Sequence, residues 1–225
     1  MTVSRGVTTK IDNFDRAQAF TTTSYDGWQI KDTSSAGTPT YLCITEDGGA
    51  AKLTLAATSE AEIVTLYCGD VLPYDLAKLQ HLWWIAKVAG IDSVTTLVFG
   101  AANAQNDTDD TVGVSAWFRM EGSASTTAVV VETDDVTNEQ VDVATGETLA
   151  AVYKKFQLDF TNGLADVRFY IDGARVADGT TFDMSDVSSG QNVQPYVQLQ
   201  KASGTGVPSI TIAQFGVQYE WAYGA

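Results

Sequence analysis

The stretch Lys155-Phe-Gln-Leu-Asp-Phe160 decides the fold class. Its apolar side chains alternate with Lys155, Gln157 and Asp159, and this period of two is typical of a β-strand with one buried face. The next run, residues 166–177, has Asp172-Gly173 at its centre. Because Gly tolerates positive φ, Asp-Gly between two such runs predicts a tight β-hairpin. We therefore expect adjacent antiparallel strands in this part of the chain.

The same pattern extends outward in both directions. Further strands are expected at residues 52–56, 63–68, 81–88, 95–99, 114–120, 128–132, 193–199 and 209–221. Short runs of this kind separated by turn residues are typical of an all-β sandwich or barrel. Pro195 lacks the amide hydrogen of a central strand and predicts a sheet edge or a strand start.

Few segments depart from this pattern. Residues 72–79 are the best helical candidate and are expected to form one short turn or a loop, since Pro73 and Asp75 suit a first turn. Polar residues 103–110 and 133–147 predict long exposed loops. Residues 1–24 are expected to form an arm or peripheral strand, and residues 25–225 one sandwich domain.

The composition indicates a folded acidic protein. Hydrophobic residues make up 44% and charged residues 18% of the 225, which separates the chain from disordered sequences. The formal charge of −15 disfavours nucleic acid and anionic membranes as partners, since both would repel the chain. The first residues lack an apolar signal core, so we expect synthesis in a cytoplasm without a signal peptide.

Two cysteines, Cys43 and Cys68, each lie in an apolar run that resembles a buried strand. Free buried thiols are expected because a chain of this size does not need a bridge. A disulfide is an alternative if the two strands are neighbours.

Two acidic segments could bind Ca²⁺, which prefers oxygen ligands. The first contains Asn106, Asp107, Asp109 and Asp110, and the second contains Glu132, Asp134 and Asp135. Neither has the spacing of an EF-hand loop, and solvated turn residues are the simpler interpretation. Whether a metal binds is left open.

Enzymatic chemistry finds little support in the sequence. Glu132 and Asp134 share a strand face, as the two carboxylates of a glycosidase would, but no third acid or apolar interleaving accompanies them. The single histidine, His81, lies in a strand next to paired tryptophans, where a packed or rim residue is a simpler interpretation than a catalytic base. Phosphate-loop, zinc and dinucleotide motifs are absent, so we expect no catalytic residue and no cofactor.

The tryptophans admit two interpretations, a sugar-stacking platform or ordinary core packing. They are Trp28, Trp83, Trp84, Trp117 and Trp221. Adjacent Trp83 and Trp84 must point to opposite sides of their strand, so one of them is expected to face a loop, a second layer or a partner.

Two segments carry a family resemblance. The run Val167-Arg-Phe-Tyr-Ile-Asp-Gly-Ala-Arg-Val176, and Phe182-Asp-Met-Ser185 followed by residues 194–201 and 210–212, resemble the C-terminal half of concanavalin A-like (laminin-G-like) jelly-roll domains. Trp28 and Leu82-Trp-Trp84 extend the resemblance over roughly residues 25–225. It implies a two-sheet antiparallel β-sandwich; no lectin metal ligands or glucanase acids can be carried over.

The amino-acid sequences of these segments are similar to those of tailed-phage structural proteins. The resemblance therefore implies a non-enzymatic virion protein, a capsid decoration or cement protein whose partner is the major capsid protein and which forms homo-oligomers such as trimers. The alternative is a carbohydrate- or receptor-binding module of a head or tail fibre, and a glycanase is a weaker third.

Overall fold

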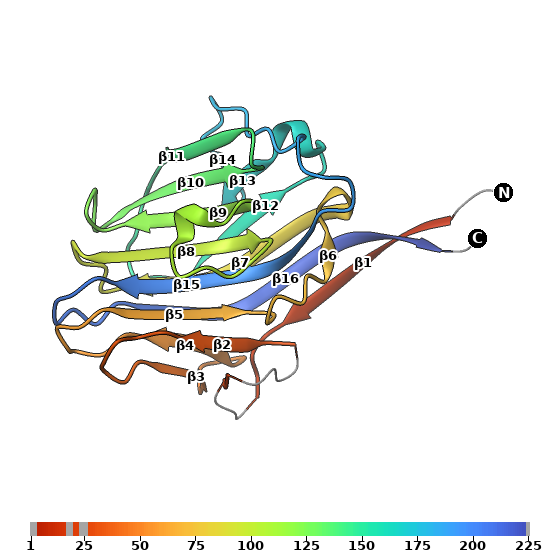
Figure 1. Cartoon of the computed structure of the whole chain (residues 1–225). Coiled ribbons are helices and arrows are strands. Elements are labelled where there is room, and N and C mark those ends of the chain that lie inside the picture. Colours follow the sequence, from red (N-terminus) through yellow and green to blue (C-terminus); the bar gives the residue numbers. More distant parts are fainter. Residues whose placement is uncertain (1–3, 17–19, 23–26, 224–225) are drawn as a thin grey trace.

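The computed structural model describes residues 4–16, 20–22 and 27–223; the side chains at positions 4, 5 and 221–223 lie outside it. Two antiparallel sheets pack face to face (Figure 1). The first sheet has the order β14 (Ala174–Val176), β13 (Arg168–Ile171), β12 (Lys154–Asp159), β7 (Leu79–Ala89), β16 (Ser209–Tyr223), β4 (Ala50–Thr54) and β3 (Thr40–Ile44), and β1 (Ser4–Asp12) also pairs with β16. The expected all-β sandwich is confirmed.

The second sheet is built in the same way. Its order is β11 (Glu139–Thr148), β10 (Ala128–Asp134), β9 (Ser115–Glu121), β8 (Thr95–Ala102), β15 (Asn192–Lys201), β5 (Glu62–Tyr67) and β2 (Gln29–Asp32), and the short β6 (Tyr74–Asp75) pairs with β15. Three 3-10 turns complete the described structure: η1 (Leu76–Lys78), η2 (Asp109–Thr111) and η3 (Leu164–Asp166). No helix in the described residues has the length and apolar character needed to cross a membrane.

Aromatic rings join the two sheets. Phe156 on β12 is 1% exposed, and its ring meets Phe99 at 4.9 Å and Phe118 at 5.1 Å edge-to-face from the second sheet. A second group forms where Trp28 and Trp84 pack on Phe215, with ring centroids 5.3 and 4.7 Å away. These contacts combine apolar burial with a favourable ring geometry, and they set the spacing of the layers.

The segment 1–24, expected as an arm or peripheral strand, takes part in the sandwich where it is described. β1 pairs with β16 from Ser4↔Tyr223 to Asp12↔Phe215. Phe14 and Phe20 follow as core residues, 0% and 4% exposed.

The hairpin predicted at Asp172-Gly173 is confirmed. Ile171 pairs with Ala174, and the turn residues Asp172 and Gly173 have φ of 51° and 83°. Two positive φ values in a two-residue turn match the right-handed twist of the flanking strands.

Three local predictions need correction. Residues 133–147 do not form a loop, because β10 continues to Asp134 and β11 covers residues 139–148; β11 is an exposed edge strand, so polar side chains do not prevent pairing. Residues 103–110 do form a loop, but it packs on the second sheet and Asp109 is only 4% exposed.

Pro195 lies inside a central strand; it is tolerated because β6 pairs up to Val193 and β5 only from Val197. The segment 72–79 contains one 3-10 turn, as expected.

A buried ion pair fastens one end of the sandwich. Lys201 and Glu62 are both 0% exposed at the side chain, with Nζ and Oε1 3.9 Å apart. Lys201 donates to the carbonyl oxygens of Ala56, Thr58 and Gly206, while Glu62 accepts from Ala56 N and Thr58 Oγ1. The pair therefore organises two neighbouring loops without reaching solvent.

Truncation of the central aromatic contact should destabilise the whole sandwich. Phe156→Ala is expected to lower the free energy of unfolding by about 3–5 kcal/mol, since it leaves a cavity between the sheets. Urea denaturation followed by tryptophan fluorescence measures this. The outward-facing neighbour Gln157→Ala serves as control and should change stability by less than about 1 kcal/mol; equal effects would contradict the assigned strand faces.

Removal of the buried cation should be more costly than removal of the pair. Lys201→Met leaves Glu62 buried without its counter-ion and should cost about 3 kcal/mol or more. The double variant Lys201→Met/Glu62→Gln is expected to lose less than the sum of the two single variants, by at least ~1 kcal/mol in a double-mutant cycle. Additive losses would mean that the two groups do not interact.

Candidate functional site

Polar side chains gather on the outer face of the second sheet. On β9, three alternate residues, Ala116, Phe118 and Met120, are in the core. Trp117, Arg119 and Glu121 therefore point outward, as the period of two requires. On the adjoining β10, Glu132 pairs in register with Trp117 and also faces outward.

The loop between β8 and β9, residues 103–114, covers part of this face and is called the β8–β9 loop below (Figure 1). Its Val112 joins a small buried cluster with Tyr67, Val98, Ala102, Trp117 and Tyr196. The carbonyl oxygen of Asn106 accepts hydrogen bonds from Tyr196 Oη at 3.1 Å and Gln198 Nε2 at 2.9 Å. The loop is thus fixed to the sheet by apolar packing and by hydrogen bonds.

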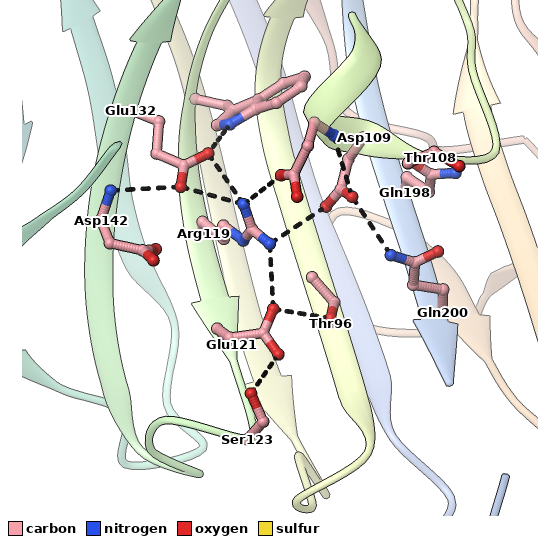
Figure 2. Close-up of polar contacts among 12 residues, drawn as sticks. Thr96, Thr108, Asp109, Arg119, Glu121, Ser123, Glu132, Asp142, Gln198 and Gln200 are labelled. Atoms are coloured by element: carbon pink, nitrogen blue, oxygen red, sulfur yellow. Dashed lines mark hydrogen bonds and ion pairs between the residues drawn. The ribbon is translucent and has the colours of Figure 1, made fainter. Parts of the chain in front are cut away.

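Arg119 lies at the centre of the carboxylates on this face (Figure 2). Its Nη1 donates to Asp110 Oδ1 at 2.6 Å and to Glu132 Oε1 at 3.1 Å, and its Nη2 donates to Glu121 Oε2 at 3.1 Å. Asp109 Oδ2 is 4.0 Å from Nη2. One guanidinium therefore connects the sheet carboxylates to the two acids of η2, and we call this group the Arg119 cluster.

The pKa values of acids in the Arg119 cluster are shifted in different directions, depending on whether burial or hydrogen bonding dominates. Burial raises the pKa of Glu132 to about 7, against the opposing effects of the Trp117 indole, which donates to it at 2.8 Å, and of Arg119. Burial likewise raises the pKa of Asp109. For Glu121 burial is outweighed by hydrogen bonds from Ser123, Thr96 and Arg119, and its pKa is lowered. Glu132 is thus a carboxyl group that titrates near neutrality.

A pocket of about 190 Å³ opens beside the cluster. Five carboxylate residues contribute to its lining, and none of its lining residues is basic: these acids are Asp109, Asp110, Glu132, Asp134 and Glu139. Trp117, Val112 and Val141 add apolar surface.

The candidate calcium ligands of each segment interact with different partners. Asp107 lies 3.3 Å from Lys31 Nζ, whereas Asp109 and Asp110 approach Arg119. In the second segment the carboxylate of Asp135 accepts from the backbone N–H groups of Thr137, Asn138 and Asp186. Within the described residues no group of three or more His, Cys, Asp or Glu side chains is arranged to hold a metal ion.

The possible glycosidase acids, Glu132 and Asp134, do lie on one strand and both line the pocket. His81 is on the other sheet, with Nδ1 3.6 Å from Asp159 Oδ1 and 3.3 Å from Gln157 Nε2. Cys43 and Cys68 do not form a disulfide with each other, as in the first of the two alternatives, but both are half-buried rather than buried. Burial raises the pKa of Cys68 to about 12.

The tryptophans do not form one platform. Trp28 and Trp84 are core residues, and Trp117 is buried beneath the β8–β9 loop. Trp83 points outward, opposite to Trp84 as predicted, and its ring covers Gly216, where a Cβ would lie 2.0 Å from Cζ2. Its Nε1 donates to Gln214. The side chain of Trp221 lies outside the described residues.

Sequence reasoning missed Arg119 and Glu121, which complete the cluster. The available signal was the alternation of Trp117, Arg119 and Glu121 with the apolar residues of the same strand, which marks an outward polar row. The proximity of Asp109 and Asp110 to this row could not be read from spacing, because it depends on how the β8–β9 loop folds back.

Comparison with known proteins supports the fold alone. No protein-family model and no curated protein sequence matches the chain. Among solved structures, a glycoside hydrolase family 16 endo-glucanase from Bacteroides ovatus has a TM-score of 0.60 at 11% identity, covering 92% of this chain and 99% of that one. The Emp47p carbohydrate recognition domain has a TM-score of 0.58 at 10% identity, with 94% of each chain covered.

A third solved structure, a Shewanella oneidensis protein of unknown function, has a TM-score of 0.58 at 9% identity over 100% of this chain and 92% of that one. The three structures share the jelly-roll sandwich but include an enzyme, a recognition domain and an uncharacterised protein. The chain therefore has the concanavalin A-like jelly-roll fold, which is common to lectins and glycoside hydrolases. Identities near 10% transfer no activity.

The raised pKa of Glu132 should appear in the pH dependence of stability. Its pKa of about 7 in the folded protein exceeds the ordinary value of 4.5, so the folded state binds this proton more tightly. The contribution of Glu132 is therefore greatest below pH 4.5 and is lost as the pH rises to about 7. Relative to Glu132→Gln, the wild type should lose on the order of 2–3 kcal/mol between pH 4.5 and pH 8.

Urea denaturation of both proteins across this pH range measures the difference. Glu60→Gln, which removes an exposed carboxylate, is the matched control and should run parallel to the wild type. A difference between wild type and Glu132→Gln that does not change with pH would contradict a carboxyl group titrating near pH 7.

Proposed function

We propose that the protein is a non-enzymatic virion structural protein, a decoration protein on the outside of a tailed-phage head. The observation that carries this proposal is the two-stranded ribbon formed by β1 and the end of β16, which extends beyond the sandwich (Figure 1). β7 pairs with β16 only up to Tyr219, so residues 220–223 pair with β1 alone. A projecting ribbon can reach a neighbouring subunit while the sandwich stays outside.

The ribbon offers two features that suit docking. Val7 and Ile11 on β1 are 51% and 55% exposed, which is uncommon for large aliphatic side chains in two nearby strand positions. Ile11 on β1 and Trp83 on β7 both pair with Gly216 of β16, which lies between them. Residues paired in this way point to the same face of the sheet, so Trp83 extends the apolar surface of Val7 and Ile11. Along its other edge β1 pairs with no described strand, which leaves backbone groups for a partner strand.

The hydrogen bonds that the carboxylates make with Arg119 support a role without catalysis. A glycosidase needs two acids that flank an open space for the scissile bond. Here Glu132, Asp110 and Glu121 all accept hydrogen bonds from Arg119, and the β8–β9 loop covers the adjoining part of the face. Hydrolysis of a polysaccharide would require this loop to move and Arg119 to release an acid.

The phage assignment itself rests on a sequence resemblance to tailed-phage structural proteins, carried by residues 167–176, 182–185, 194–201 and 210–212. The proposed partner is the major capsid protein. Symmetric oligomers such as trimers would bind a capsid lattice through several weak contacts at once, which raises avidity without a large single interface. The acidic charge of −15 keeps such a protein soluble before assembly.

The second candidate is a carbohydrate- or receptor-binding module of a head or tail fibre. It is favoured by the pocket lined by Trp117 and by several carboxylates, which can accept hydrogen bonds from hydroxyl groups. The fold shared with the Emp47p carbohydrate recognition domain is compatible with it. This candidate uses the second sheet, whereas the decoration proposal uses the ribbon.

The decoration proposal is tested by cosedimentation with bare capsids of the tailed phage that carries the gene. The wild-type protein should pellet with the capsids and saturate at a fixed number of copies per lattice unit. The ribbon variant Val7→Glu/Ile11→Glu should lose at least tenfold in affinity, because it puts two charges into the docking surface.

The matched control is Val152→Glu/Val207→Glu, which adds the same charge at two exposed valines outside the ribbon. It should bind capsids like the wild type. Equal binding of both double variants would remove the ribbon from the interface. Failure of the wild type to bind, together with its retention on a glycan array, would replace decoration by carbohydrate recognition.

A further inference from the structure

The acidic pocket beside the Arg119 cluster has an excess of negative charge, a buried inner part and an exposed mouth. Its inner part is formed by Glu132 and Asp109, which are 6% and 4% exposed. Glu139 and Val141 are exposed and form its mouth. Its volume of about 190 Å³ corresponds to roughly six water molecules at about 30 Å³ each. This is enough space for the end of a long side chain.

Asp109, one of the lining residues, has a carboxylate oxygen without a hydrogen-bond partner among the described residues. This oxygen, Oδ2, is buried. Arg119 Nη2, at 4.0 Å, is too distant for a hydrogen bond. A buried carboxylate oxygen without a donor is unfavourable by itself, so a ligand that donates a hydrogen bond would satisfy it.

We propose that this pocket binds a primary ammonium group, the end of a lysine side chain of a partner protein. An ammonium group provides three N–H donors and one positive charge, which match the unsatisfied Asp109 Oδ2 and the surplus of carboxylates. The methylene stem would contact Val112 and Val141, as lysine stems commonly lie along apolar surface. The pocket is separate from the ribbon, so the inference does not depend on the proposed decoration role.

A metal ion fits this pocket less well than an ammonium group. No three of its acidic side chains are arranged around a common point among the described residues. The guanidinium of Arg119 already pairs with Glu132 and Asp110, so these two carboxylates are not free to converge on a metal ion.

Binding of a cation here should depend on pH because Glu132 titrates near neutrality. The charged groups that face Glu132 are Arg119 from β9, Asp142 from β11, and, across the pocket, Asp109 and Asp110 from η2; Asp134 and Glu139 lie along the same lining. Burial raises the pKa of Glu132 to about 7, so its negative charge is present mainly above that pH. The ammonium group should therefore bind more tightly at pH 8 than at pH 5.5.

The probe is N-α-acetyl-L-lysine methylamide, titrated into the ¹⁵N-labelled full chain. The reporter is the Trp117 indole N–H, which donates to Glu132 Oε2 at 2.8 Å and should respond to charge in the pocket. We expect a saturable shift with a dissociation constant in the millimolar range and at least fivefold weaker binding at pH 5.5. The N-ε-acetylated probe, which lacks the charge, should cause no shift.

Two variants locate the site. Asp109→Asn should weaken binding at least tenfold, and Glu139→Gln, an exposed change at the mouth that leaves the core untouched, should weaken it two- to fivefold. Glu60→Gln is the control and should bind like the wild type. Equal shifts with the acetylated probe, or wild-type affinity in both pocket variants, would overturn the proposal. Displacement of the probe by Ca²⁺ at lower concentration than the probe itself would instead make the pocket a metal site.

Discussion

The interaction of Arg119 with the surrounding carboxylates determines what the outer face of the second sheet can do. Its guanidinium joins two sheet strands to the η2 turn through Glu132, Glu121 and Asp110. Of these residues Arg119 and Glu132 are buried, and loss of either would leave the other charge buried without compensation. The β8–β9 loop is therefore held in one position, and Trp117 and Tyr196 stay covered.

The two docking surfaces proposed above, the ribbon and the acidic pocket, differ in chemistry. The ribbon presents aliphatic side chains and a free strand edge at one end of the sandwich, whereas the pocket presents carboxylates on the second sheet. An apolar strand surface suits a permanent contact, since burial of Val7 and Ile11 is favourable in any salt. Charge attraction at the pocket is weakened by salt and acid, which suits a reversible contact.

Much of the fold could be predicted from the sequence, because alternation and turn chemistry act locally. The period of two in residues 155–160 and the Asp172-Gly173 turn both correspond to observed elements. β11 escaped prediction because it is an edge strand in which exposed residues largely alternate with half-buried ones, most of them polar, so apolar alternation is weak. The prediction from Pro195 was wrong for a related reason. Between the residues of β15 that pair with β6 and those that pair with β5, a short gap leaves one side of the strand unpaired, and this gap permits a proline in a central strand.

The candidate site was less accessible to prediction. Glu132, Asp109 and Asp110 were recognised as acidic residues, but the cation that unites them lies elsewhere on the chain and the loop geometry decides their contacts. A search for metal ligands by spacing therefore separated residues that the fold combines around Arg119. The pKa of Glu132 follows from burial, which only the three-dimensional arrangement provides.

The central claim, that the β8–β9 loop is closed on the second sheet, is tested most directly by native-state amide hydrogen exchange. The N–H groups of Asn103 and Val112 donate to the carbonyl oxygens of Val114 and Asp109 at 2.9 Å each. Their exchange should be slowed at least a hundredfold relative to an unstructured peptide, and Arg119→Met should remove most of this protection. Exchange at the unprotected rate in the wild type would show that the loop is open and the face is accessible.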